Sequence, residues 1–285
     1  MLAAMAEPTS AAGAVPVDSV PEFSPHPVEA QLLRGRRALV TGGDSGIGAG
    51  ICLELAAHGA AVAINHLGGA DTAREMVARI EGSGGRALAV PMDVSREQDV
   101  SQAFAQARRE LGGLDLLVNN AGLEHPYELT EMPLEAWQKV IDVNLTGAFL
   151  CAREAARTMR ADGVRGVIVN ISSVHEQIPW IGFSHYCASK GGMKLFAQSI
   201  ARELAPHGIR VVAVAPGAIA TPINADVLAD PKKSGEVQAE IPLGRWGEVS
   251  DVARAVAWVA SEQADYVVGT TLFVDGGMTL YPRFV

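Results

Sequence analysis

The sequence has few cysteines, few aromatic residues and no uninterrupted apolar stretch long enough for a membrane span. Its 3 cysteines, Cys52, Cys151 and Cys187, lie far apart and lack the CxxC spacing of a zinc or redox motif. This usage fits a reducing compartment better than a disulfide framework, so we expect a cytoplasmic protein. A membrane span needs about 18 consecutive apolar residues, which occur nowhere in the chain.

Basic residues are scarce too. The chain has 23 Lys and Arg against 32 Asp and Glu, a net charge of −9, and no basic run, which argues against a nucleic-acid partner. Hydrophobic residues make up 48%, enough for a core. Residues 1–32 hold 5 of the 15 prolines and no Lys or Arg, unlike a secretory or transit signal. We predict a flexible tail over 1–32 and a single domain over 33–285.

From Arg36 onward, short apolar runs alternate with stretches of helical period. The predicted strands are 38–41, 61–65, 87–90, 115–118, 166–171, 210–215 and 271–274. The predicted helices are 47–58, 71–81, 97–111, 134–160, 186–205 and 249–261. The alternation indicates βαβ units with right-handed crossovers. We therefore predict a doubly wound α/β Rossmann fold, a seven-stranded parallel sheet with helices on both faces and ligands at the strand carboxyl ends.

A glycine turn follows the first predicted strand and opens a helix. Its members are Gly42, Gly43, Asp44, Ser45, Gly46, Ile47 and Gly48. Glycines let the backbone approach a phosphate closely, and a helix N-terminus offers free N–H groups and positive dipole. The TGxxxGxG spacing meets the GxGxxG pattern only loosely, and a ligand-free turn is the alternative.

Other predicted strand ends add groups that could hold a dinucleotide. Asp93 and Val94 follow the third strand, where a carboxylate could accept a hydrogen bond from the adenine amino group. Asn119, Ala121 and Gly122 follow the fourth and could brace the loop beside a cofactor. Each is weak singly because Asp and Asn also stabilise turns, but their common placement indicates one site.

The second predicted strand ends at Asn65 and His66, with neither the acid that selects NAD nor the Arg that pairs with the 2′-phosphate of NADP. Both side chains can hydrogen-bond a ribose without repelling a phosphate. We therefore expect use of both NAD and NADP, with a lean toward NADP. The alternative is that His66 is only a solvated loop residue.

Tyr186 and Lys190 are four residues apart at the start of a predicted helix, so both project from one face. A phenol titrates near pH ~10, and a nearby ammonium favours the phenolate and lowers that pKa. Ser173, at the end of the fifth strand, can donate to a substrate oxygen. Asn144, within the predicted helix 134–160, could bend the helix and hold a water for proton relay to Lys190.

Together these residues resemble the short-chain dehydrogenase/reductase family from Arg36 to about Thr279. The matching elements are the glycine turn, the Asn-Asn-Ala-Gly turn, Asn144, Ser173, Tyr186-x-x-x-Lys190, and Pro216-Gly217 with Thr221. The resemblance implies hydride transfer at nicotinamide C4, with Tyr186 as acid/base and Ser173 polarising the carbonyl; Ser172 is the rival serine. It further implies that Lys190 holds the nicotinamide ribose and Asn144 completes the relay. The carboxamide contacts it implies are Pro216, Gly217, Ile219 and Thr221.

The stretches Ser172–Trp180, Pro216–Asn224 and Gly276–Pro282 make the chain most similar, within this family, to bacterial glucose 1-dehydrogenases. The resemblance implies oxidation of β-D-glucose to the lactone, usually by a homotetramer. A site that selects a sugar needs paired donors and acceptors, which Glu124, His175 and Asn224 can provide beside Ser173. The alternative is that His175 and Glu176 only cap or solvate their loop.

Two other functions remain open. One is a carbonyl or 3-oxoacyl reductase with a less polar substrate. The other is a non-catalytic NAD(P)-binding regulator, which the presence of both Tyr186 and Lys190 disfavours. No His spacing indicates a metal site. By the family resemblance, helices 134–160 and 186–205 imply a homotetramer.

Overall fold

The computed structural model describes residues 31–280; residues 1–30, most of the predicted tail, and residues 281–285 lie outside the described part. Seven parallel strands form one sheet in the order β3-β2-β1-β4-β5-β6-β7. They are β1 (Arg37–Val40), β2 (Ala61–His66), β3 (Arg86–Pro91), β4 (Leu116–Asn119), β5 (Gly166–Ile171), β6 (Ile209–Pro216) and β7 (Thr271–Val274). The predicted doubly wound fold is confirmed.

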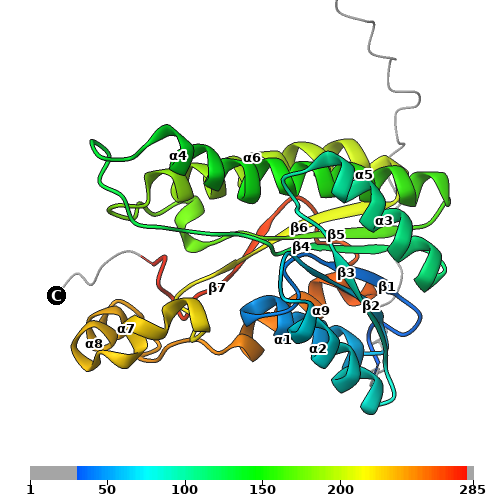
Figure 1. Cartoon of the computed structure of the whole chain (residues 1–285), viewed down its shortest axis with the longest axis horizontal. Helices are drawn as coiled ribbons and strands as arrows, with labels where there is room; N and C mark the ends of the chain where they lie inside the picture. The colour runs from blue at the N-terminus through cyan, green and yellow to red at the C-terminus, as the bar shows by residue number, and fades with distance from the viewer. Residues whose placement is uncertain (1–30, 281–285) are drawn as a thin grey trace, which may run out of the picture. The chain divides into compact units, whose positions relative to one another are not determined.

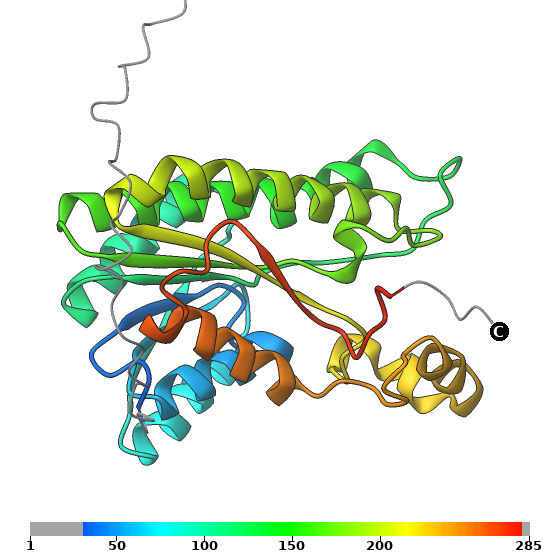
Figure 2. The same ribbon diagram turned by 180° about the vertical axis from the view of Figure 1, so that it is seen from behind.

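Helices cover both faces of the sheet (Figures 1 and 2). One layer contains α1 (Gly46–Ala57), α2 (Ala70–Gly82) and α9 (Val249–Ala260). The other contains α3 (Glu97–Leu111), α4 (Leu134–Ile141), α5 (Gly147–Ala161) and α6 (Ser184–Leu204). Within residues 31–280, no helix combines the length and the apolar character that crossing a membrane requires.

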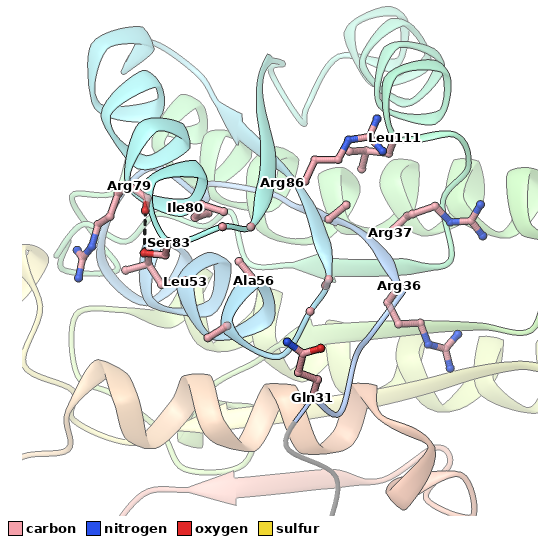
Figure 3. Close-up of a pocket in the computed structure, with 17 residues that line it drawn as sticks. Gln31, Arg36, Arg37, Leu53, Ala56, Arg79, Ile80, Ser83, Arg86 and Leu111 are labelled. Carbon is pink, nitrogen blue, oxygen red and sulfur yellow. Dashed lines mark hydrogen bonds between the residues drawn. The ribbon is translucent and has the colours of Figure 1, made fainter.

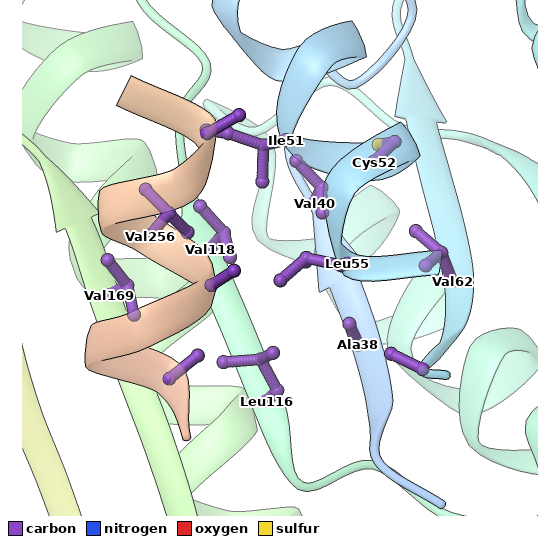
Figure 4. Packing of buried hydrophobic residues seen from close by; sticks show 14 of the residues in the cluster. Ala38, Val40, Ile51, Cys52, Leu55, Val62, Leu116, Val118, Val169 and Val256 are labelled. Carbon is purple, nitrogen blue, oxygen red and sulfur yellow. The ribbon is translucent and has the colours of Figure 1, made fainter. Parts of the chain in front are cut away.

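Each face of the sheet has its own apolar core. Val40 packs with Ile51 of α1 and Val256 of α9 in one cluster (Figure 4). The neighbouring Leu39 belongs to the opposite cluster, together with Phe104 of α3. Successive strand residues point to opposite faces, so a strand buried on both sides is apolar throughout. These two cores hold the strand ends in fixed positions.

The predicted single helix 134–160 is wrong in its middle. A π-helical segment, Asp142–Thr146 (η2), separates α4 from α5. Fully buried Asn144 lies at its centre, where its side chain bonds to the loop after β4 instead of facing solvent. The local bend expected at Asn144 is this π segment, because a π turn inserts an extra residue into the helical ladder.

Two helices were absent from the prediction: α7 (Ala225–Ala229) and α8 (Pro231–Ala239). They form a lobe that extends from the sheet beyond the carboxyl end of β6 (Figure 1). Asp230 caps α8, since its carboxylate accepts hydrogen bonds from the backbone of Lys232 and Lys233. Neither helix contains a buried residue, so no apolar periodicity marks them.

Candidate active site

The glycine turn between β1 and α1 is built for close backbone approach. Gly46 has a φ of +51°, in the left-handed region that favours glycine. A Cβ on Gly48 would lie 2.1 Å from the Gly42 carbonyl oxygen, so only glycine fits there. Ser45 at the helix N-cap supplies no side-chain hydrogen bond, which leaves the first N–H groups of α1 without a side-chain cap. This end of α1 can therefore hold a phosphate.

The Asn65 side chain, predicted to contact a ribose, bonds to the protein's own backbone. Its Oδ1 accepts a hydrogen bond from Gly42 N at 3.0 Å, and its Nδ2 donates to the carbonyls of His66, Val90 and Met92 at 3.0–3.3 Å. With its amide engaged by backbone groups, the buried side chain braces the glycine turn. His66 is buried as well, against the alternative of a solvated loop residue, and its Nδ1 has no partner among the described residues.

Asp44 contributes its charge at the turn after β2. Gly69, in that turn, has no side chain, and a Cβ there would lie only 2.3 Å from the Asp44 carboxylate. The Asp44 side chain therefore lies directly against the turn after β2. At the end of β3, Asp93 accepts hydrogen bonds from the backbone and hydroxyl of Ser95. Partial burial opposes ionisation there, but the Ser95 hydrogen bonds prevail and hold the pKa of Asp93 below its ordinary value. Val94 is buried beside it, against Gly147.

The second asparagine of the pair after β4, not the first, faces the glycine turn. Asn120 Nδ2 donates to the carbonyls of Thr41 and Gly42 at 2.9 and 3.0 Å, and Thr41 Oγ1 accepts from the backbone N–H groups of Asn120 and Ala121. Asn119 is buried and donates to Ala148 and Asn170, so it braces the sheet, while its assignment to the cofactor stays a prediction. Strand alternation turns the two neighbours in opposite directions, and of the amides expected to brace this loop it is Asn120 that holds the glycine turn.

A cavity of about 170 Å³ opens at the carboxyl ends of β4, β5 and β6. It gathers most of the residues predicted for the reacting end and the carboxamide side. Its lining includes Ile47, Asn120, Gly122, Glu124, Ser172, Ser173, Tyr186, Lys190, Pro216, Gly217, Ile219, Thr221 and Asn224. The fold thus brings residues from five separate stretches of the sequence to one site.

Burial dominates the electrostatics of the Tyr186–Lys190 pair. Lys190 Nζ donates to the Ile171 carbonyl at 2.8 Å and lies 5.6 Å from the centroid of the Tyr186 ring. Burial lowers the pKa of Lys190 to about 8, although Glu124 and Glu176 oppose the shift.

The pKa of Tyr186 lies above its ordinary value in the ligand-free protein, first because of burial and then because of the Glu124 carboxylate. A hydrogen bond from Ser173 acts in the other direction. The phenol is therefore not more acidic than an ordinary tyrosine in the ligand-free protein, contrary to the expectation from its Lys190 neighbour, because desolvation and Glu124 raise its pKa.

Ser173 and Asn144 position the catalytic turn of α6. Ser173 bonds to Tyr186 and also accepts from the backbone N–H of His175 at 3.2 Å, whereas the Ser172 hydroxyl has no partner among the described residues. Asn144 pairs with both backbone groups of Leu123 and donates to Ser189 Oγ at 3.1 Å. Ser189 in turn donates to the Tyr186 carbonyl at 2.7 Å. Asn144 thus ties the loop after β4 to α6.

Of the three predicted substrate residues beside Ser173, two line the cavity. Glu124 is half-buried, which raises its pKa while Lys190 opposes the shift. Asn224 donates to the Ile219 carbonyl at 2.8 Å. His175 stands behind the lining, stacked on Trp180 with ring centroids 4.6 Å apart, and burial lowers its pKa. The Trp180 ring also stacks on Phe183.

A larger cavity, of about 730 Å³, lies at the opposite edge of the sheet and contains none of these groups. Its arginines point apart and not toward a common centre (Figure 3). Arg37 pairs with Asp115 at 2.7 Å and Arg86 donates to the carbonyl of Glu110, near the end of α3. These arginines satisfy buried acids and helix C-termini, so this cavity is not the candidate active site.

Comparison with known proteins agrees with this geometry. A family model described as enoyl-(acyl carrier protein) reductase matches residues 42–279. The chain is 48% identical to 3beta-hydroxysteroid dehydrogenase 1 of Eggerthella lenta and 42% identical to glucose 1-dehydrogenase 2 of Bacillus subtilis, in each case over 88% of this chain and 97% of the relative. A gluconate 5-dehydrogenase from Burkholderia cenocepacia, solved with NADP and tartrate, superposes with a TM-score of 0.84 at 34% identity, covering 89% of this chain and 99% of that one.

Proposed function

We propose a substrate for this chain, which belongs to the short-chain dehydrogenase/reductase family and is an NAD(P)-dependent oxidoreductase acting on alcohol groups. The proposed substrate is an aldose, glucose first, oxidised at its anomeric hydroxyl to the lactone. The observation that supports it is the carboxylate of Glu124 in the same cavity wall as Tyr186 and Ser173. Reduction of a simple carbonyl needs no such acceptor, whereas a sugar presents several hydroxyls to bind.

The residues at the glycine turn fit a dinucleotide. Glycine at position 48 lets the turn fold tightly on the Gly42 carbonyl, and the start of α1 lacks a side-chain cap, so its N–H groups can hold the diphosphate. His66 has a ring nitrogen without a partner among the described residues, at the end of β2, where an adenosine ribose is expected. The nicotinamide supplies hydride acceptance and return when bound.

This chain's own residues then handle the proton. We propose that Tyr186 takes the proton of the substrate hydroxyl during oxidation and returns it during reduction. Ser173 donates to the substrate oxygen, and Lys190 holds the nicotinamide ribose and offsets negative charge on Tyr186. Asn144 keeps the helical turn of Tyr186 in register through Leu123 and Ser189.

We propose that both NAD and NADP are used, and the charge distribution after β2 argues against the expected lean toward NADP. The described end of β2 offers no Arg or Lys for a 2′-phosphate, and the Asp44 carboxylate lies against the turn that follows it. A negative charge at this turn opposes an additional phosphate.

A second candidate is an alcohol with a large apolar body, such as a hydroxysteroid. Trp180 lies between Phe183 and His175, and its ring approaches Tyr186 edge-on with centroids 6.1 Å apart. This aromatic wall could cover the apolar face of such a substrate, and it is the feature that favours this alternative.

For the assembly we propose a homotetramer formed through α5 and α6. A groove of about 470 Å³ runs between these helices, and Phe149 and Leu195 on them are 40% and 68% exposed. Exposed apolar side chains of this size favour burial against another subunit. Sedimentation velocity tests this, and a monomer would refute it.

The substrate proposal is tested by a panel of β-D-glucose, other aldoses, a 3β-hydroxysteroid and a 3-oxoacyl thioester, each with both nicotinamides, followed at 340 nm. We expect oxidation of aldoses. Glu124→Gln should lower kcat/KM for the aldose by about 10- to 100-fold, the scale of one charge-assisted hydrogen bond. The matched control is Glu131→Gln, an exposed residue on the same loop that lies outside the cavity lining. Turnover of the steroid or thioester with no aldose oxidised would refute the proposal.

A further inference from the structure

Glu176 carries a buried carboxylate close behind the reacting groups. Its side chain is 0% exposed. It ends the short 3-10 helix η3 (Val174–Glu176), which Ser173 caps, and its backbone N–H donates to the Ser173 carbonyl at 3.0 Å. Neither carboxylate oxygen has a hydrogen-bond partner among the described residues. A buried carboxylate without hydrogen bonds is costly, so its retention needs a reason.

The groups facing this carboxylate are lysines of α6. Lys194 Nζ lies 3.3 Å from Oε1 of Glu176. Tyr186, Lys190 and Lys194 recur every four residues and so share one face of α6. Glu176 also packs against the turn of α6 that carries Lys190, because a Cβ on the adjacent Gly191 would lie 3.8 Å from the Glu176 carbonyl oxygen. From there its negative charge favours the protonated Lys190 amine.

The surroundings supply few other charges. Glu124, from the loop after β4, is the other carboxylate that raises the pKa of Lys190. The strand β6 also contacts η3, and residues 211–216 of this strand include no charged residue. Glu176 therefore lies beside Lys194 and beside the Lys190–Gly191 turn, and it does not line the substrate cavity.

We propose that Glu176 is a positioning residue of the active site, whose buried charge, divided between Lys194 and Lys190, keeps the Lys190 amine protonated beside Tyr186. Lys194 weakens the action of Glu176 on Lys190, because its own positive charge pairs with the Glu176 carboxylate at 3.3 Å. The inference rests on the proposed function in giving Lys190 a catalytic role. A purely structural ion pair between Glu176 and Lys194 is the competing explanation, and it predicts no effect on Lys190.

The two explanations differ in the sign of two substitutions. Glu176→Gln removes a negative charge, so Lys190 should lose its proton at lower pH. Lys194→Met removes a competing positive charge, so Lys190 should keep its proton to higher pH. Each shift should be on the order of one pH unit, the effect of a charge a few ångströms away. Glu176→Asp, which keeps the charge, should restore most of the wild-type behaviour.

Two measurements give the pH at which Lys190 loses its proton. The first is the high-pH limb of the kcat/KM profile, measured with whichever alcohol in the panel is oxidised. The second is NMR titration of ε-carbon-labelled lysine in the ligand-free protein, which has only five lysines, with Lys190→Met assigning the signal. Glu75→Gln, an exposed change on α2, is the matched control and should move neither reading.

Opposite shifts in E176Q and K194M, seen in both readings, support the proposal. Lower thermal stability with an unmoved limb and an unmoved lysine titration assigns Glu176 to structure alone and overturns it. If K194M does not fold, the E176Q and E176D pair decides by itself. If the wild type oxidises no alcohol, the proposed function fails, and the lysine titration still decides the effect of Glu176.

Discussion

Replacing Lys190 with methionine should stabilise the protein while abolishing turnover. Lys190 is 4% exposed, and burial lowers its pKa from the ordinary 10.5 to about 8. At pH 7 the amine is therefore still charged, and keeping this charge buried lowers the stability of the folded protein. The difference of about 2.5 units corresponds to ~3 kcal/mol at 1.36 kcal/mol per unit. This is the free energy by which charging the buried amine destabilises the ligand-free fold.

Part of this gain is offset. The Lys190→Met variant loses the hydrogen bond to the Ile171 carbonyl, a contact of about 1 kcal/mol. Methionine has a similar length and no charge, so it can fill the same space without a large cavity. The net stabilisation is then about 2 kcal/mol, or an increase of about 4–8 °C in Tm for a domain of this size.

The pH dependence identifies the cause. Between pH 8 and 10.5 the unfolded chain binds the lysine proton more tightly than the folded protein does, so wild-type stability rises with pH in that window. The advantage of the variant should be largest below pH 8 and should shrink toward pH 10.5. Differential scanning calorimetry at pH 7 and pH 10 measures it, with the exposed Lys232→Met as control. A difference that does not change with pH, or a less stable variant, would contradict charge burial as the cause.

Two further changes test the two ends of the site. Tyr186→Phe should lower kcat by at least about 10³-fold, since the phenol is the proposed acid/base, while the Kd for reduced cofactor, followed by nicotinamide fluorescence, changes only a few-fold; turnover close to wild type would eliminate Tyr186 from that role. Gly48→Ala places a Cβ 2.1 Å from the Gly42 carbonyl and should cost at least about 2 kcal/mol in urea unfolding and weaken NAD(P) binding, whereas Gly235→Ala, with open space around it, should do neither.

The strands could be predicted closely because both faces of the sheet are buried. Strand β5, at 166–171, and β7, at 271–274, begin and end where the sequence predicts. The lobe of α7 and α8 could not be found this way, because its helices are short and bury no residue. At Asn144 a local bend could be expected from a polar residue within a helix, but not its π-helical form, since one inserted residue changes the period too little to show in the pattern.

Within the site, the sequence identified the region but not the direction of each side chain. Asn65 and Asn119 were assigned to the cofactor, yet both bond to the protein itself, and Asn120 holds the glycine turn. An asparagine after a parallel strand can turn toward a ligand or toward its neighbours, and tertiary contacts decide which. The spacing of Tyr186 and Lys190 was visible in the sequence, but their burial was not.

That burial changes how the pair should be understood. It moves the two pKa values apart, with Lys190 down to about 8 and Tyr186 above its ordinary value. Since each shift favours the neutral form, the ligand-free site holds the phenol proton firmly, which suits donation to a carbonyl. Oxidation requires the phenol to lose this proton, so any charge that keeps Lys190 protonated promotes it. Glu124 raises the pKa of both Tyr186 and Lys190, so it favours the protonated amine but opposes the phenolate. Glu176 packs against the Lys190–Gly191 turn and does not line the cavity, so its charge supports the protonated amine from outside the substrate site.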